Sequence, residues 1–258
     1  MAYTEEQSCH FTREKHAVDR ELQVLMYQTI AEGRTASDAR VLEYLVYGVA
    51  RRIRVLRRSI EKVFLLLPPS AQHPVPCDSL DDVQINLHAF FINLSGIFDN
   101  WAWAYVFRHD LEAKIGDRRN VGLFNKATQS HLPHMLREYL ESKETTVWHG
   151  DYLKSFRDAL AHRIPLYVPP ALYTLEDSNL YNHLEKEKVD CIKTLRFARL
   201  QEIEWEQPAI GDPCLFFMHS FADSQVPTQV YLHPQMLSDA RSIAEFGTLF
   251  LKHWNEGS

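Results

Sequence analysis

The sequence predicts a mainly α protein, an antiparallel helical bundle with a long N-terminal helix pair and a small β-hairpin near the C-terminus. Three observations support this prediction. Glycine is scarce, with 9 residues in 258. Long segments repeat apolar residues at the spacing of an α-helix. Near the C-terminus, two short apolar segments flank a polar turn, which is the pattern of a hairpin.

The first 75 residues are expected to form a helix pair that packs on the bundle. A first helix is predicted from about Glu5 to Glu32, where "EGRTAS" interrupts the pattern. Thr35 or Ser37 can cap the second helix by accepting hydrogen bonds from free backbone N–H groups. Residues 68–79, "PPSAQHPVPCDS", end that helix because proline lacks the N–H and clashes with the preceding turn. We interpret this segment as a linker.

A third helix is predicted over residues 79–110, with the densest apolar content of the chain. Asn86, Asn93 and Asn100 recur every seven residues on one stripe of this helix, together with small residues. Two interpretations fit the stripe. The amides fix the register of a close helix contact, or they support polar side chains on the helix predicted at about 146–163.

The remaining elements follow from the same patterns, with polar or proline-containing breaks between them. Helices are expected at about 132–142, 146–163, 184–206 and 234–254, and strands within 214–221 and 228–233. We expect residues 79–204 to form the helical bundle. Residues 205–258 add the hairpin and the last helix, and together they make one compact unit.

The charge balance predicts that any nucleic-acid binding is local. The formal net charge is −6, so the protein has no global basic field. The segment "RRIRVLRR" places Arg51, Arg54 and Arg58 on one helix stripe, which would suit phosphate groups. The alternative is a solvated helix face paired with Glu43, Glu61 or another helix.

Cysteine spacing, hydropathy and missing motifs argue against several classes of protein. The four cysteines are far apart, so neither a disulfide framework nor a cysteine zinc site is expected. The polar N-terminus is unlike a signal peptide, and no apolar segment approaches the roughly 18 residues of a membrane helix. We therefore expect a cytoplasmic protein with no membrane partner. Phosphate-loop, nucleophile-elbow and zincin motifs are not found in the sequence.

The segment "SFRDALAHRIP" carries the strongest candidate site. Arg157, Asp158 and His162 lie in the last turns of a predicted helix, which Pro165 should end near Arg163. Histidine titrates near neutrality and can move protons, and the arginine fork matches two phosphate oxygens. Asp158 can orient these groups. The alternative is a C-terminal cation pair that satisfies helix carbonyls.

The sequence "RDALAH" resembles the signature of the HEPN superfamily, which is Arg, then Asn, Asp or His, then three residues, then His. The resemblance covers about Ser79 to Arg163, although the Tyr of one subgroup is replaced here by Ile164. It implies a helical bundle in which Arg157 and His162 are catalytic and Asp158 supports them.

The resemblance also implies a function. HEPN proteins include metal-independent endoribonucleases of toxin–antitoxin, abortive-infection and CRISPR-associated systems, which act as dimers. The expected partners are RNA, a second copy of the chain, and an antitoxin or another defence protein, with no metal or cofactor. Asn93 and Asn100 are the expected supporting residues. The alternative is a non-catalytic module of the same fold that binds a protein or a nucleotide.

Overall fold

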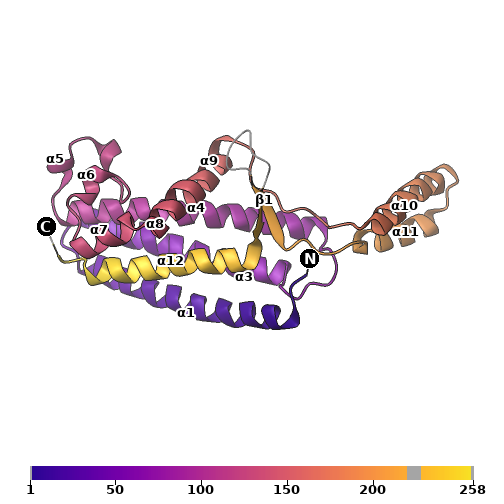
Figure 1. Cartoon of the computed structure of the whole chain (residues 1–258), viewed down its shortest axis with the longest axis horizontal. Helices are drawn as coiled ribbons and strands as arrows, with labels where there is room; N and C mark the ends of the chain where they lie inside the picture. Colours follow the sequence, from indigo (N-terminus) through magenta and orange to yellow (C-terminus); the bar gives the residue numbers. More distant parts are fainter. Residues whose placement is uncertain (1, 220–227, 257–258) are drawn as a thin grey trace.

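The computed structural model describes residues 2–219 and 228–256. Four long helices run side by side as a bundle (Figure 1): α1 (Glu5–Thr35), α3 (Arg51–Leu66), α4 (Cys77–Arg108) and α12 (Leu232–Lys252). The predicted mainly helical fold with a small antiparallel sheet near the C-terminus is confirmed. In the described residues, no helix is both long and apolar enough to cross a membrane.

The N-terminal helices differ from the prediction at their junction. A capping box between Thr4 and Gln7 starts α1, which continues through Thr35. Thr35 is therefore helical, and the cap of the next helix is Asp38, whose carboxylate accepts the backbone N–H of Arg40. The helix then runs without a break through α2 (Ala39–Leu42), the π-helix η1 (Glu43–Ala50) and α3.

The central helix α4 carries most of the core. It begins at Cys77 with Pro76 as its N-cap, two residues before the predicted start at residue 79, because proline is compatible with a helix start. Its side chains Phe90, Phe91 and Trp101 are fully buried. One continuous core joins α4 to the N-terminal helices, to α12 and to the strands.

A chain of short helices follows α4 and leads to the candidate motif. These are α5 (Glu112–Ile115), η2 (Arg118–Asn120), α6 (Lys126–Gln129), α7 (His134–Glu141), α8 (Lys143–Val147), the π-helix η3 (Trp148–Leu153) and α9 (Lys154–His162). The last three form one helical rod, and Arg163 is extended, as the position of Pro165 predicts.

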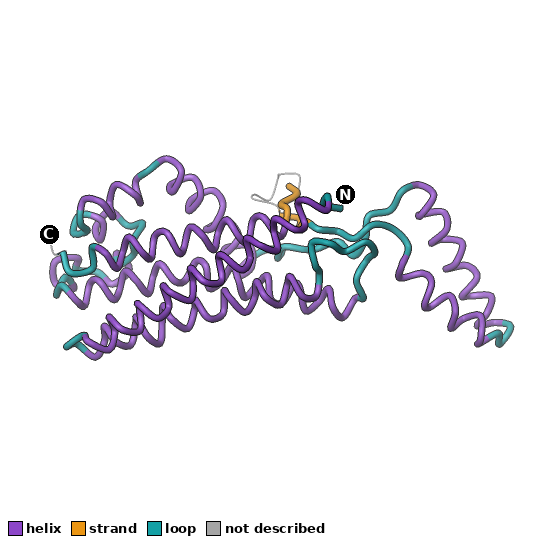
Figure 2. The backbone as a smooth tube through the Cα atoms, turned by 90° about the horizontal axis from the view of Figure 1, so that it is seen from below, coloured by secondary structure: helices purple, strands orange, loops and turns teal. Residues whose placement is uncertain are grey.

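The segment predicted as one helix at 184–206 is a helical hairpin. It consists of α10 (Leu175–Lys193) and α11 (Phe197–Glu206), followed by the short η4 (Gln207–Ala209). The single-helix prediction was wrong because the Thr194 hydroxyl bonds the Asp190 carbonyl and Leu195 takes a left-handed conformation, with φ of 57°. Both views show this hairpin projecting beyond the bundle (Figures 1 and 2).

The two strands β1 (Phe216–His219) and β2 (Thr228–Tyr231) pair antiparallel, with Phe216 opposite Tyr231. Their predicted connection, 222–227, lies outside the described residues. Leu232 and His233, predicted as strand, begin α12 instead. The extended strap between α9 and α10 is held by backbone pairing of Tyr167 with Met218 and of Leu172 with Asp212.

Candidate functional site

The orientation of α9 is set by its apolar face. Phe156 is fully buried and stacks on Phe91 of α4, with ring centroids 4.4 Å apart and planes 16° from parallel. Ala159 and Leu153 are buried on the same side. Arg157 lies between these buried positions and faces away from the core, and His162 is the last residue of α9, where it is also exposed. A buried aromatic anchor thus presents the polar motif to solvent.

The structure pairs two of the three predicted catalytic residues. Nη2 and Nε of Arg157 donate to one carboxylate oxygen of Asp158, at 2.7 and 3.0 Å. Their side chains are 47% and 34% exposed, so the ion pair contributes little stability and mainly orients the guanidinium. His162 is the last residue of α9 and lies about 140° from Arg157 around an ideal helix.

The exposure of His162 argues against the alternative in which it forms a cation pair that only satisfies carbonyls at the end of the helix. An imidazole that only satisfied helix carbonyls would lie against them at the helix end. His162 is exposed, and within the described part of the chain no residue is hydrogen-bonded to its ring. The imidazole is therefore accessible to a ligand.

An acidic residue of α4 lies near the motif. The protein atoms around Asp99 desolvate its carboxyl and raise its pKa, although part of its surface is exposed. The positive charges of Arg157 and Arg52 partly oppose that rise. Asp99 therefore lies in the fields of two arginines, one from α9 and one from α3. No local sequence pattern predicts that Asp99 lies near Arg52 and Arg157, because the three residues are far apart along the chain.

His149 of η3 is a second histidine close to the motif. Its ring stacks on Phe124, with centroids 3.4 Å apart. Burial lowers its pKa to about 4, and the charges of Lys154 and Arg157 act in the same direction. His149 is therefore neutral at physiological pH. Sequence reasoning assigned no role to this residue, because it lies outside the motif and near no other predicted ligand.

The asparagine stripe of α4 binds an arginine of α3. Nε of Arg52 donates to Oδ1 of Asn100 at 2.7 Å, and Nη1 donates to Oδ1 of Asn93 at 3.1 Å. The guanidinium crosses α4 at Gly96, where an added Cβ would lie 2.6 Å from it. This corrects the expectation that Asn93 and Asn100 support Arg157 and His162. At these two residues the stripe is a close helix contact, as the first interpretation proposed, whereas Asn86 donates to the Asp82 carbonyl of its own helix.

A hollow of about 520 Å³ opens beside Arg52. Its lining comes from η1, α3 and α4 and comprises Glu43, Tyr44, Tyr47, Gly48, Arg51, Arg52, Val55, Asn93 and Asn100. Burial lowers the pKa of Arg52, and its hydrogen-bond partners are neutral amides instead of a carboxylate. A partly buried cation with neutral partners can accept an anion. The π-helical η1 forms one wall, and such helices are frequent at functional sites.

The three arginines of the predicted phosphate-binding stripe on α3 have different surroundings. The Arg51 guanidinium lies 4.5 Å from the centroid of the Tyr47 ring and lines the hollow. Arg58 binds Glu61 at 2.6 Å, which agrees with the alternative of a paired, solvated face. Arg54 is exposed. Arg52, which sequence reasoning left out of the stripe, is the arginine that faces α4.

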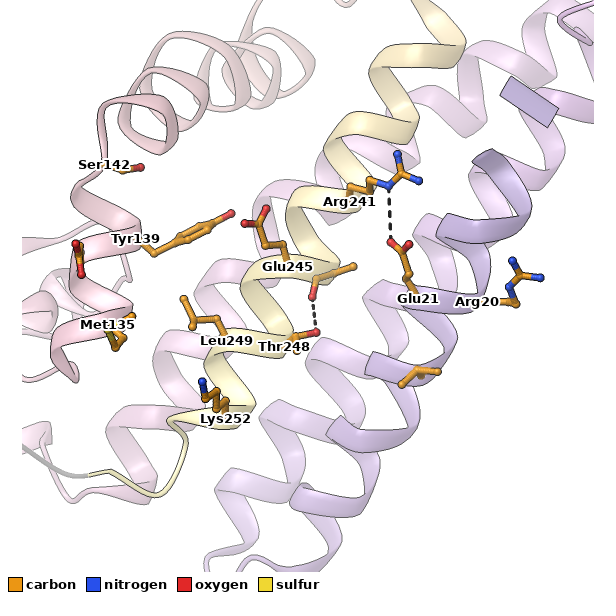
Figure 3. A pocket seen from close by; sticks show the side chains of 13 residues that line it. Arg20, Glu21, Met135, Tyr139, Ser142, Arg241, Glu245, Thr248, Leu249 and Lys252 are labelled. Atoms are coloured by element: carbon orange, nitrogen blue, oxygen red, sulfur yellow. Dashed lines mark hydrogen bonds and ion pairs between the residues drawn. The ribbon is translucent and has the colours of Figure 1, made fainter. Parts of the chain in front are cut away.

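A larger groove of about 1,090 Å³ lies between α1, α7 and α12, and it shares no residue with the motif (Figure 3). Across it, Tyr139 of α7 points toward Glu245 of α12. Burial and the neighbouring Glu245 raise the pKa of Tyr139 to about 12, so its hydroxyl stays protonated at neutral pH. None of the three predicted catalytic residues, Arg157, Asp158 and His162, lines this groove.

Comparison with protein-family models, with curated proteins and with solved structures gives no match to this chain. Among the residues the structure describes, no three His, Cys, Asp or Glu side chains are grouped as a metal ion would require. The assignment of a function therefore rests on the motif and on the geometry around it.

Proposed function

We propose that the protein is a metal-independent endoribonuclease of HEPN type, acting in bacterial defence or a toxin–antitoxin system. The observation that carries this proposal is the placement of Arg157 and His162. Both are exposed on one short helix anchored by Phe156, and neither is buried in a structural role. An accessible imidazole and an oriented guanidinium are the groups that RNA cleavage without a metal requires.

The proposed reaction is attack of a ribose 2′-hydroxyl on the adjacent phosphorus. His162 accepts the proton of that hydroxyl, and Arg157 stabilises the charge on the phosphorane oxygens. Asp158 holds the guanidinium by the two hydrogen bonds described above. The bond to the 5′-oxygen breaks, leaving a 2′,3′-cyclic phosphate and a 5′-hydroxyl.

The leaving 5′-oxygen also needs a proton, and one imidazole per motif serves one transfer at a time. His162 of a second copy would supply the other proton if two motifs face each other. His149 is poorly suited to this task, because a histidine with a pKa of about 4 is almost entirely unprotonated at neutral pH. The proposal therefore includes a homodimer.

The test is cleavage of a mixed RNA pool in EDTA by chain purified free of partners. Wild type should cut, whereas His162→Ala and Arg157→Ala should lose at least roughly 100-fold in rate. The matched control is His134→Ala, an exposed histidine of α7 that lies 3.7 Å from Glu138. Cleavage that persists in His162→Ala, or that His134→Ala also removes, would contradict the assignment.

The hollow at Arg52 supports a second candidate, a non-catalytic module that binds a nucleotide. Arg52 offers a partly buried cation, and Tyr44 and Tyr47 offer aromatic surface in the same hollow. Titration calorimetry with nucleoside monophosphates would test this candidate. Arg52→Gln should weaken binding by roughly ten-fold or more, whereas the exposed Arg54→Gln should not. Equal binding by all three proteins would reject the hollow as the site.

A further inference from the structure

The helical hairpin of α10 and α11, residues 175–206, is here called the arm. It leaves the bundle through the extended strap and projects into solvent (Figures 1 and 2). Its own core consists of three buried side chains, Leu184, Cys191 and Ile203. Two helices that bury so few side chains against each other leave most of their surface uncovered.

The arm is unusually rich in exposed apolar residues. Seven of the nineteen large apolar side chains that are exposed in the described residues lie on it, although it is about an eighth of the chain. These seven are Leu175, Leu180, Val189, Ile192, Leu195, Phe197 and Trp205. Trp205 is 77% exposed and Phe197 is 61% exposed. Such concentrations of apolar surface mark interaction sites, and aromatic residues dominate interface energies.

Charge is segregated along the arm. The base, residues 175–185 and 200–206, has six carboxylates and no Lys or Arg. The tip, residues 186–199, has five Lys or Arg against two carboxylates. Some of these charges pair within the arm, as Arg199 does with Glu187 at 2.9 Å and Glu202 at 3.1 Å.

Other charges on the arm are free to meet a partner. Lys186 and Lys193 at the tip are exposed, as are Glu176 and Glu204 at the base. Within the described residues, none of the four has an ion-pair partner. The basic tip and the acidic base can therefore both engage groups outside the chain.

We propose that the arm docks antiparallel on the arm of a second copy, tip against base. A two-fold axis across the middle of the arm brings each basic tip to the acidic base of the other copy, whereas parallel arms would oppose like charges. Two hairpins paired in this way form a four-helix bundle, in which exposed apolar side chains of α10 and α11 pack between the two copies. RNA is disfavoured as the occupant, because the base has no Lys or Arg and its unpaired carboxylates, such as Glu176 and Glu204, repel phosphate.

This contact is separate from the motif on α9 and goes beyond the proposed function. If two copies also meet through α9, the arms join those dimers into a larger assembly. In either case, disrupting the arms should lower the mass of the assembly at least two-fold, so the test does not depend on the ribonuclease proposal.

The first experiment measures the mass of the full chain by light scattering in 0.15 M salt. Wild type should have at least twice the 30.1 kDa mass of one chain. Trp205→Glu and Phe197→Glu should lower the observed mass at least two-fold and raise the dissociation constant by roughly ten-fold or more. The matched control is Leu65→Glu on α3, where the leucine is 67% exposed. Its mass should equal that of wild type, and circular dichroism should show equal helix content in all variants.

The second experiment tests the tip-to-base arrangement. Lys193→Glu should weaken assembly by roughly five-fold, because symmetry repeats the substitution at both ends of the contact. Adding Glu204→Lys to the same chain should restore affinity to within about two-fold of wild type. A monomeric wild type, or an assembly that the Trp205 and Phe197 variants leave intact, would overturn the proposal. Loss of RNA binding on Lys193→Glu in a monomeric protein would overturn it in favour of RNA.

Discussion

Asp239 makes the stability of the protein depend on pH in an unusual direction. This residue of α12 is fully buried. Its carboxylate accepts hydrogen bonds from Trp148 Nε1 at 2.9 Å, from the Tyr152 hydroxyl at 2.7 Å and from Gln235 Nε2 at 3.0 Å. The network joins α12 to η3, the helix that leads into α9. Burial raises the pKa of Asp239 to about 6 despite the three donors.

The sign and size of the effect follow from linkage. An ordinary unfolded aspartate has a pKa near 3.9, so the folded state holds its proton more tightly. The stability that this group contributes is complete below about pH 4 and is lost as the pH rises to about 6. A difference of about two pKa units corresponds to about 3 kcal/mol in the free energy of unfolding.

The perturbation is Asp239→Asn, and the assay is urea unfolding between pH 4 and pH 8. An asparagine oxygen can still accept from Trp148 and Gln235, and its amide can donate to the Tyr152 hydroxyl. The variant should match wild type near pH 4 and exceed its stability by up to about 3 kcal/mol at pH 8. The control is Asp19→Asn, because Arg57 lowers the pKa of Asp19. The difference in the free energy of unfolding between Asp19→Asn and wild type should be constant above about pH 5. A constant difference for the Asp239 variant would refute the reasoning.

Three further predictions concern stability. Burial lowers the pKa of His233 to about 4, so the stability that His233 contributes is present above pH 6.5 and is lost as the pH falls. In urea unfolding, the free energy of unfolding of wild type should therefore fall by about 3 kcal/mol between pH 7 and pH 4, and His233→Gln should remove this decline. Gly96→Ala should destabilise by about 1–3 kcal/mol in thermal unfolding, because a Cβ would lie 2.6 Å from the Arg52 guanidinium. Gly150→Ala, whose Cβ meets nothing within 4 Å, should instead stabilise η3 by about 0.5–1 kcal/mol. Equal effects of the two alanines would contradict the packing described at Gly96.

Helix boundaries set by proline could be predicted because the cause is local. The prolines at 68–69 end the second helical rod, and Pro165 ends α9, because a proline in a helix interior lacks the N–H and clashes with the preceding turn. The turn of the arm has no such signal. The sequence "KTLRFA" contains neither glycine nor proline, and the left-handed residue of the turn is Leu195, a residue type that rarely takes this conformation.

The candidate site was predictable in its exposed parts and not in its buried ones. The motif spacing indicated Arg157, Asp158 and His162, and the pairing of the first two follows from their adjacency. Which arginine of "RRIRVLRR" faces α4 depends on the close approach that Gly48 and Gly96 permit between helices. The link from Asp239 to Trp148 spans 91 positions, and no local pattern encodes a contact at that separation.

Attack by the ribose 2′-hydroxyl, with His162 as the proton acceptor, is tested by the ends of the products cleaved from a short RNA in EDTA. The substrate is compared with the same RNA carrying a single 2′-deoxy nucleotide at the mapped cut site. We expect 2′,3′-cyclic phosphate and 5′-hydroxyl ends from the RNA, no cut at the deoxy position, and neither product with His162→Ala. Cleavage at the deoxy position, or products with 5′-phosphate ends, would contradict attack by the 2′-hydroxyl and the role assigned to His162.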